Sequence, residues 1–162
     1  MPAISVLYSD FVKNSMASFE TEAPGPEEMT NRWSRIIADE LPYFVAVDGQ
    51  GKILGYAYAM LYRSRPAYQY TVEDSVYVSR EAQGRGMGRL LLEAVIKASE
   101  ATGKRQMIAV IVDHGSEGSM ALHKSMGFTE AGLLKAVGKK EGKWLSTCFL
   151  QRALGEGDQS LP

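Results

Sequence analysis

Three glycines separated by single residues, Gly84, Gly86 and Gly88, lie between an apolar, strand-like segment and a helical pattern. Because glycine carries no side chain, the backbone there can approach a ligand closely. The helix that follows presents unpaired backbone N–H groups and the positive end of its dipole. With Arg85 and Arg89 beside them, these features predict an anion site, most simply for phosphate or pyrophosphate.

The spacing of this glycine-rich loop does not match either standard phosphate motif. The order is G-x-G-x-G, whereas a dinucleotide-binding loop needs G-x-G-x-x-G and a P-loop ends in G-K-[ST]. A nucleotide-binding module is therefore the weaker hypothesis. The remaining alternative is that the glycines mark only a flexible turn.

The composition excludes several classes of protein. The chain has 162 residues with 18 basic and 19 acidic side chains, a formal net charge of −1. A general nucleic-acid binder would normally be basic, so we expect no nucleic-acid partner. No apolar run approaches the roughly 18 residues of a membrane span, and the start lacks the basic region of a secretory signal. We therefore expect a cytoplasmic protein without membrane association.

Few side chains are suited to bind a metal. The single cysteine, Cys148, excludes an intramolecular disulfide and a cysteine-rich zinc site. The two histidines, His114 and His123, leave too few ligands, so we expect no metal. Cys148 lies in an expected strand, which favours buried packing over a nucleophilic role.

The hydrophobic periodicity predicts a single α+β domain, a mixed sheet flanked by helices, over residues 1–154, followed by a flexible tail at 155–162. Each expected element follows from a local pattern of apolar residues and turn signals. The expected helices are 4–13, about 27–40, 88–102 and 117–126, and the expected strands are 43–47, 53–62, 71–78, 106–112, 128–135 and 144–151.

Several segments together resemble one enzyme superfamily. The loop QGRGMG at 83–88 and ALHKSMGF at 121–128 resemble motifs of the GNAT acetyltransferases. SFETEAP at 18–24, RPAYQYTVEDSVYV at 65–78 and GKWLSTCFLQRAL at 142–154 resemble the phosphinothricin and methionine sulfoximine N-acetyltransferases. The resemblance covers roughly residues 4–154. It implies the GNAT fold and acetyl transfer from acetyl-CoA to the amine of a small, amino-acid-like substrate.

Acetylation of an amine requires a base, because an amine at neutral pH is mostly protonated. The resemblance assigns this role to Glu73. Strand alternation places Glu73, Ser75 and Tyr77 on one face of the 71–78 strand and Asp74 on the other. We therefore expect Asp74 to matter less. The alternative for Glu73 is a solvent-facing charge on an edge strand.

The resemblance also implies groups that stabilise the oxyanion and the leaving thiolate. Backbone amides at 76–78, where the superfamily's strand splays from its neighbour, would bind the oxyanion. His123, aligned with the family's tyrosine, would be the general acid, or else a packing histidine. For Ser116 we favour a helix cap over a cofactor contact. The implied cofactor-binding residues are Val76, Tyr77, Val78, Gln83, Gly84, Arg85, Gly86, Met87, Gly88 and Ser116.

An amino-acid substrate carries a carboxylate, which arginine binds through two parallel hydrogen bonds. Arg63 and Arg65 precede the Glu73 strand and are the candidates for this contact. Phe19, Glu20 and Tyr77 complete the implied substrate site. Each of these residues has the alternative of being ordinary surface.

The sequence departs from the family pattern at two places. Family members usually begin with a strand before the first helix, and that strand is missing or replaced here, so we expect the sheet edge to be altered or completed by a partner. Glu141 stands where phosphinothricin acetyltransferases carry a histidine, which leaves methionine sulfoximine, methionine sulfone or another small amine open.

The branch forms homodimers, so the resemblance implies a homodimer here as well. The last strand carries Trp144, Leu145, Phe149 and Leu150, which fits an interface or, alternatively, the core. A non-catalytic module that binds acyl-CoA as a sensor remains the alternative function.

Overall fold

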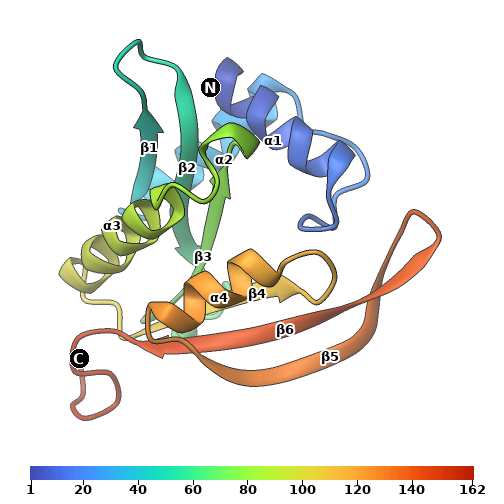
Figure 1. Ribbon diagram of the computed structural model, residues 1–162. Helices are drawn as coiled ribbons and strands as arrows, with labels where there is room; N and C mark the ends of the chain where they lie inside the picture. The colour runs from blue at the N-terminus through green and yellow to red at the C-terminus, as the bar shows by residue number, and fades with distance from the viewer.

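The computed structural model describes all residues, 1–162, and contains one six-stranded sheet with the strand order β1-β2-β3-β4-β6-β5 (Figure 1). The helices are α1 (Pro2–Asn14), α2 (Pro26–Ala38), α3 (Met87–Ala101) and α4 (Glu117–Ser125), with short 3-10 turns η1 (Pro66–Tyr68) and η2 (Arg80–Ala82). The strands are β1 (Tyr43–Val47), β2 (Ile53–Leu61), β3 (Thr71–Val78), β4 (Gln106–Val112), β5 (Thr129–Lys140) and β6 (Lys143–Ala153).

Every expected element is present, and β1, β3 and β4 have the expected bounds. The largest difference is β5, which continues to Lys140 instead of ending at 135. Its pairing with β6 shifts between Leu134 and Gly138, and Ala136 there has a φ of 53°. This irregularity is typical of a β-bulge. It interrupts the alternation of side chains, so strict alternation in the sequence does not predict the second half of the strand.

The sheet is mixed, as expected for an α+β domain. All neighbouring strands are antiparallel except β3 and β4, which run parallel because α3 connects them as a crossover. No strand precedes α1 in these residues, and β1 forms one edge of the sheet.

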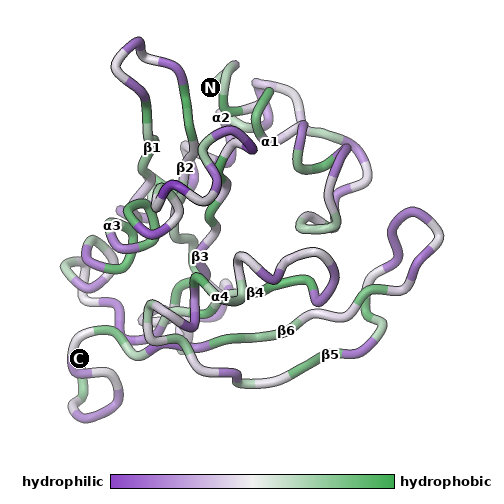
Figure 2. The backbone as a smooth tube through the Cα atoms, in the orientation of Figure 1, coloured by the Kyte–Doolittle hydropathy of each residue, from purple (hydrophilic) through white to green (hydrophobic).

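Alternating side chains on β2 divide the core between the two faces of the sheet. Ala57 and Ala59 are buried among residues of α3, whereas Tyr56 is buried against α1 and α2 on the opposite face. Hydrophobic residues follow much of β2, β4 and β6, and hydrophilic residues occupy the tip of the β5–β6 hairpin (Figure 2). The opposite face of β4 is partly open, since Val110 is 38% exposed.

The pairing of β3 with β4 stops halfway along β3. The parallel ladder covers Thr71 to Asp74 on β3 and ends at the pair Asp74–Ala109, although β3 continues to Val78 and β4 to Val112. Over the same stretch β4 remains paired with β6 and β3 with β2. The two central strands therefore splay apart, as the resemblance implied (Figure 1).

Candidate active site

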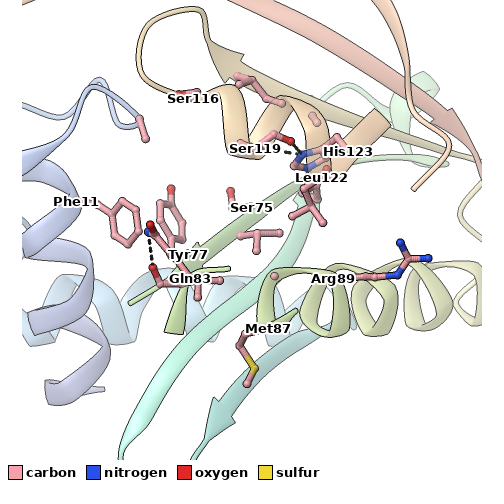
Figure 3. Close-up of a pocket in the computed structure, with 18 of the residues that line it drawn as sticks. Phe11, Ser75, Tyr77, Gln83, Met87, Arg89, Ser116, Ser119, Leu122 and His123 are labelled. Carbon is pink, nitrogen blue, oxygen red and sulfur yellow. Dashed lines mark hydrogen bonds and ion pairs between the residues drawn. The ribbon is translucent and has the colours of Figure 1, made fainter. Parts of the chain in front are cut away.

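A cavity of about 550 Å³ occupies the opening between β3 and β4 (Figure 3). Its walls come from the second half of β3, the glycine-rich loop, the start of α3, β4, and α4 with the turn before it. Phe11 of α1 and Ala17 close it from the opposite face of the sheet. Because β3 and β4 are not paired beyond Asp74 and Ala109, one cavity extends to both faces of the sheet.

Most of the residues expected to bind the cofactor line this cavity: Val76, Tyr77, Val78, Gln83, Gly84, Gly86, Met87, Gly88 and Ser116. His123 lines it as well. Arg85 is exposed and lies outside the lining, whereas Arg89, in the first turn of α3, is part of it. The local positive charge is therefore contributed by Arg89 and the helix end.

The three loop glycines serve two different purposes. Gly84 and Gly86 have φ angles of 71° and 79°, and a Cβ on either would meet no atom within 4 Å. Their left-handed backbone is the reason for glycine there, and the open space leaves the loop accessible. Gly88 differs, because a Cβ would lie 3.2 Å from Cδ2 of Leu122. That glycine lets α3 pack closely on α4.

Hydrogen bonding along β3 identifies the amides that face the cavity. The N–H of Ser79 donates to the carbonyl of Leu54 on β2 at 2.8 Å. Since successive strand N–H groups alternate in direction, the N–H of Tyr77 also points toward β2, and those of Val76 and Val78 point toward the opening. The side-chain amide of Gln83 donates to the carbonyl of Val78 at 3.2 Å, on the same side.

Ser116 stands at the N-cap position of α4, but its side chain makes no capping hydrogen bond. The expectation of a capping role was therefore wrong. Its Oγ is buried without any hydrogen-bond partner. An orphaned hydroxyl on the cavity wall suits a ligand that brings its own polar group.

His123 and Asp74 form a buried pair at the point where the β3–β4 ladder ends. Nε2 of His123 lies 2.9 Å from Oδ2 of Asp74, and the two residues are 3% and 6% exposed. Burial alone would lower the pKa of His123, but the hydrogen bond and the charge of Asp74 outweigh it and raise that pKa. Asp74 faces away from Glu73, as expected, and its contact with His123 was not anticipated from the sequence.

Glu73 is half-buried on the same face of β3 as Ser75 and Tyr77, which line the cavity, although Glu73 itself does not. Burial, followed by the neighbouring Asp74 carboxylate, raises the pKa of Glu73. The guanidinium of Arg63 acts in the opposite direction. A carboxylate with a raised pKa is a stronger base than a free one.

Apart from Tyr77, the residues expected to bind substrate do not line the cavity. The carboxylate of Glu20 accepts hydrogen bonds from Arg32 at 2.6 Å and from the hydroxyl of Tyr8 at 2.8 Å. Arg63 and Arg65 are exposed on the β2–β3 connection, and Arg63 stacks over the ring of Tyr62. The ring of Phe19 packs against Gly138 of β5.

Lys140, a residue that sequence reasoning missed, connects residues 12–18 to the β5–β6 hairpin through hydrogen bonds. Its ammonium is buried and donates to the carbonyls of Val12, Ser15 and Ser18 at 2.8–2.9 Å. Those partners precede Lys140 by more than 120 residues, so no local pattern indicates the contact. Gly138, two residues before Lys140, is the position against which Phe19 packs.

We expect Lys140→Met to lower the free energy of unfolding by about 3 kcal/mol, because three buried carbonyls lose a charged donor. Lys139→Met is the matched control. Lys139 is exposed, and its substitution should change stability by about 0.5 kcal/mol or less. Urea denaturation measures both, and equal stabilities of the two variants would contradict the assigned contact.

The model of the acetyltransferase (GNAT) family matches residues 8–128. The chain belongs to the GNAT acetyltransferase family. A phosphinothricin N-acetyltransferase of Alcaligenes faecalis is 46% identical over 162 residues, which are 100% of this chain and 82% of that protein. A methionine sulfoximine/methionine sulfone acetyltransferase of Pseudomonas paraeruginosa is 36% identical over 154 residues, 93% of this chain and 87% of its own length.

A solved GNAT structure agrees with the same family. The phosphinothricin acetyltransferase of Sinorhizobium meliloti, in complex with AcCoA, superposes with a TM-score of 0.95 at 46% identity, covering 99% of this chain and 86% of that one. The expected GNAT fold and N-acetyltransferase class are confirmed, and acetyl-CoA is the co-substrate of that class. No group of three metal-ligating side chains is present, and no helix is long and apolar enough to cross a membrane.

Proposed function

We propose that this GNAT acetyltransferase transfers the acetyl group of acetyl-CoA to the amine of a small, amino-acid-like substrate. The observation that carries the proposal is the cavity through the splayed strands. On one face of the sheet the cavity is lined by the glycine-rich loop. On the other face it is lined by Ser75 and Tyr77, on the side of β3 where Glu73 also lies. A donor held by the loop and an amine beside Glu73 would meet between β3 and β4.

The residues on the cavity wall fit such a donor. The amides around Gly84 and Gly86, with the start of α3 and Arg89, suit a pyrophosphate. Ser116 offers a buried hydroxyl without a partner. The cleft-facing amides of Val76 and Val78 suit the acetyl carbonyl and the oxyanion that develops there.

In the proposed direct transfer, Glu73 takes the proton of the amine, directly or through water, as the C–N bond forms. The Val76 and Val78 amides stabilise the oxyanion until the C–S bond breaks. His123, held as an acid by Asp74, supplies the proton for the departing thiolate, which replaces the Ser119 carbonyl as the acceptor of the Nδ1 hydrogen. Cys148 takes no part, because it lies outside this cavity and burial raises the pKa of its thiol.

For the substrate we propose the class named by the relatives: methionine sulfoximine, methionine sulfone or phosphinothricin, which suggests a role in detoxifying such compounds. Arg63 is our candidate for binding the carboxylate next to the reacting amine, which is supported by its effect on the pKa of Glu73. Arg65, Phe19, Glu20 and Tyr77 complete the site. Glu141 is the exposed first residue of the two-residue β5–β6 turn, with a φ of 47°.

A thiol-release assay with acetyl-CoA tests the proposal. The panel should contain methionine sulfoximine, methionine sulfone, phosphinothricin and the twenty protein amino acids, and the acetylated product should be identified by mass. We expect turnover with at least one of the first three compounds. Tight binding of acetyl-CoA without turnover of any amine would instead support a non-catalytic acyl-CoA sensor.

We further propose one domain over 1–154 with a short tail, a cytoplasmic location, and a homodimer. Leu145 and Leu150 are both buried, and Leu150 packs in the core with residues of α3, so we propose the opposite face of the sheet as the interface. Leu134, 49% exposed, and Val110, 38% exposed, lie on that face by their pairing with Thr147 and Phe149. β5 is also an edge strand.

We expect Leu134→Glu to shift the protein toward the monomer in sedimentation velocity, because the substitution places a charge in an apolar interface. Leu133→Glu is the matched control, since Leu133 is 50% exposed but faces the groove beside α4. A wild-type monomer at all concentrations would refute the dimer, and equal effects of both variants would refute this face.

A further inference from the structure

The hydrogen bonds of His123 occupy both ring nitrogens. Nδ1 lies 2.8 Å from the carbonyl oxygen of Ser119, and Nε2 lies 2.9 Å from Oδ2 of Asp74. A carbonyl oxygen only accepts hydrogen bonds, so Nδ1 must carry a hydrogen. A carboxylate likewise only accepts, so Nε2 carries one as well whenever Asp74 is ionised.

We propose that Asp74 is a positioning residue that keeps His123 doubly protonated, with both N–H groups directed at fixed acceptors beside the cavity. The catalytic part of this inference rests on the proposed function, in which His123 is the acid. Asp74 then raises the pKa of His123 and so extends the pH range in which this acid carries its proton.

A serine–histidine–aspartate triad would be a different interpretation of the same residues. Ser119 lines the cavity, and its Oγ lies 3.4 Å from Nδ1 of His123. The carbonyl of Ser119 is much closer, at 2.8 Å, and it takes the hydrogen of Nδ1. Nδ1 therefore has no free lone pair with which to activate the hydroxyl, and the geometry disfavours a serine nucleophile (Figure 3).

Asp74 is the one charged group in contact with His123. The other ionisable side chains that line the cavity are Tyr77 and Arg89, and neither is bonded to the imidazole. The ring of Phe128 packs edge-on against it, at 5.0 Å between centroids. Lys124, the next residue on α4, pairs instead with Glu130. The charge of His123 thus depends mainly on Asp74, which raises its pKa.

Asp74→Asn tests this dependence with little change of shape. The asparagine amide can donate to Nε2 while Nδ1 continues to donate to Ser119, so the pair stays bonded with a neutral imidazole. Imidazole ¹⁵N shifts report the protonation of each nitrogen. The chain has only two histidines, and His114→Gln assigns the signals.

In the protein without substrate, we expect His123 of the wild type to remain doubly protonated to a pH about one unit or more above that of Asp74→Asn. A wild-type His123 that is neutral at pH 6, or identical titrations of the two proteins, would overturn the proposal. If Asp74→Asn does not fold, Asp74→Ser provides a second neutral partner for the same titration. The ¹⁵N titration requires no turnover, so it tests the protonation of His123 even if no amine is acetylated.

With an active substrate, the alkaline limb of kcat against pH should move down in Asp74→Asn by the same amount as the titration. The KM for acetyl-CoA should stay within about twofold, because the loop is unchanged. A purely structural role would leave the limb in place, and an unmoved limb would overturn the catalytic half of the proposal.

Discussion

Replacing Glu73 with glutamine is expected to lower kcat by about a hundredfold or more at neutral pH, which is the usual worth of a general base. Glutamine keeps the size of the side chain and removes its ability to accept a proton. The KM for acetyl-CoA should change little, because Glu73 lies outside the cavity that the glycine-rich loop lines. Steady-state kinetics with the amine identified by the thiol-release assay measure both quantities.

The pH dependence distinguishes a lost base from a damaged site. The deficit of Glu73→Gln should shrink as pH rises, because the free amine then forms without help from the enzyme. In the wild type, activity should fall as pH drops through the pKa of Glu73. Burial raises this pKa, so the fall should occur above the pH at which an ordinary glutamate is protonated.

The control for this experiment must lie outside the site. Glu81→Gln is suitable, because Glu81 is exposed and pairs with Lys52. Asp74 is unsuitable as a control, since it is bonded to His123. A Glu73→Gln enzyme with an unchanged rate would remove Glu73 from the proposed role.

Gly86→Val is expected to weaken the binding of acetyl-CoA by about tenfold or more. Gly86 has a φ of 79° at the N-cap of α3, where a β-branched residue is strained by about 1–3 kcal/mol. Relief of that strain would turn the loop amides away from the cavity. The side chain itself would stand in the open space that a ligand needs.

Gly103→Val separates the binding effect from the strain. Gly103 has a φ of 77° just after the C-terminus of the same helix, with equally open space, and lies outside the cavity. Both variants should lose similar stability, but only Gly86→Val should raise the dissociation constant measured by calorimetry. Equal affinities would refute the assignment of the loop.

Local patterns in the sequence were sufficient to place the elements. The alternation in 71–78 and the apolar run in 106–112 gave the bounds of β3 and β4, and Gly84 and Gly86 marked the loop between β3 and α3. These features depend on the backbone preferences and polarity of neighbouring residues, so a single sequence records them. The bulged half of β5 did not follow such a pattern.

The sequence by itself determined the family, the glycine-rich loop and the face of β3 that carries Glu73. Only the tertiary structure decided that Asp74 would meet His123, 49 residues away, and that Lys140 would hold the segment before Phe19. It also decided that the cavity would open to both faces, because the ladder ends at Asp74. Such contacts join distant segments whose approach depends on the packing of the whole sheet, and no spacing of neighbouring residues encodes it.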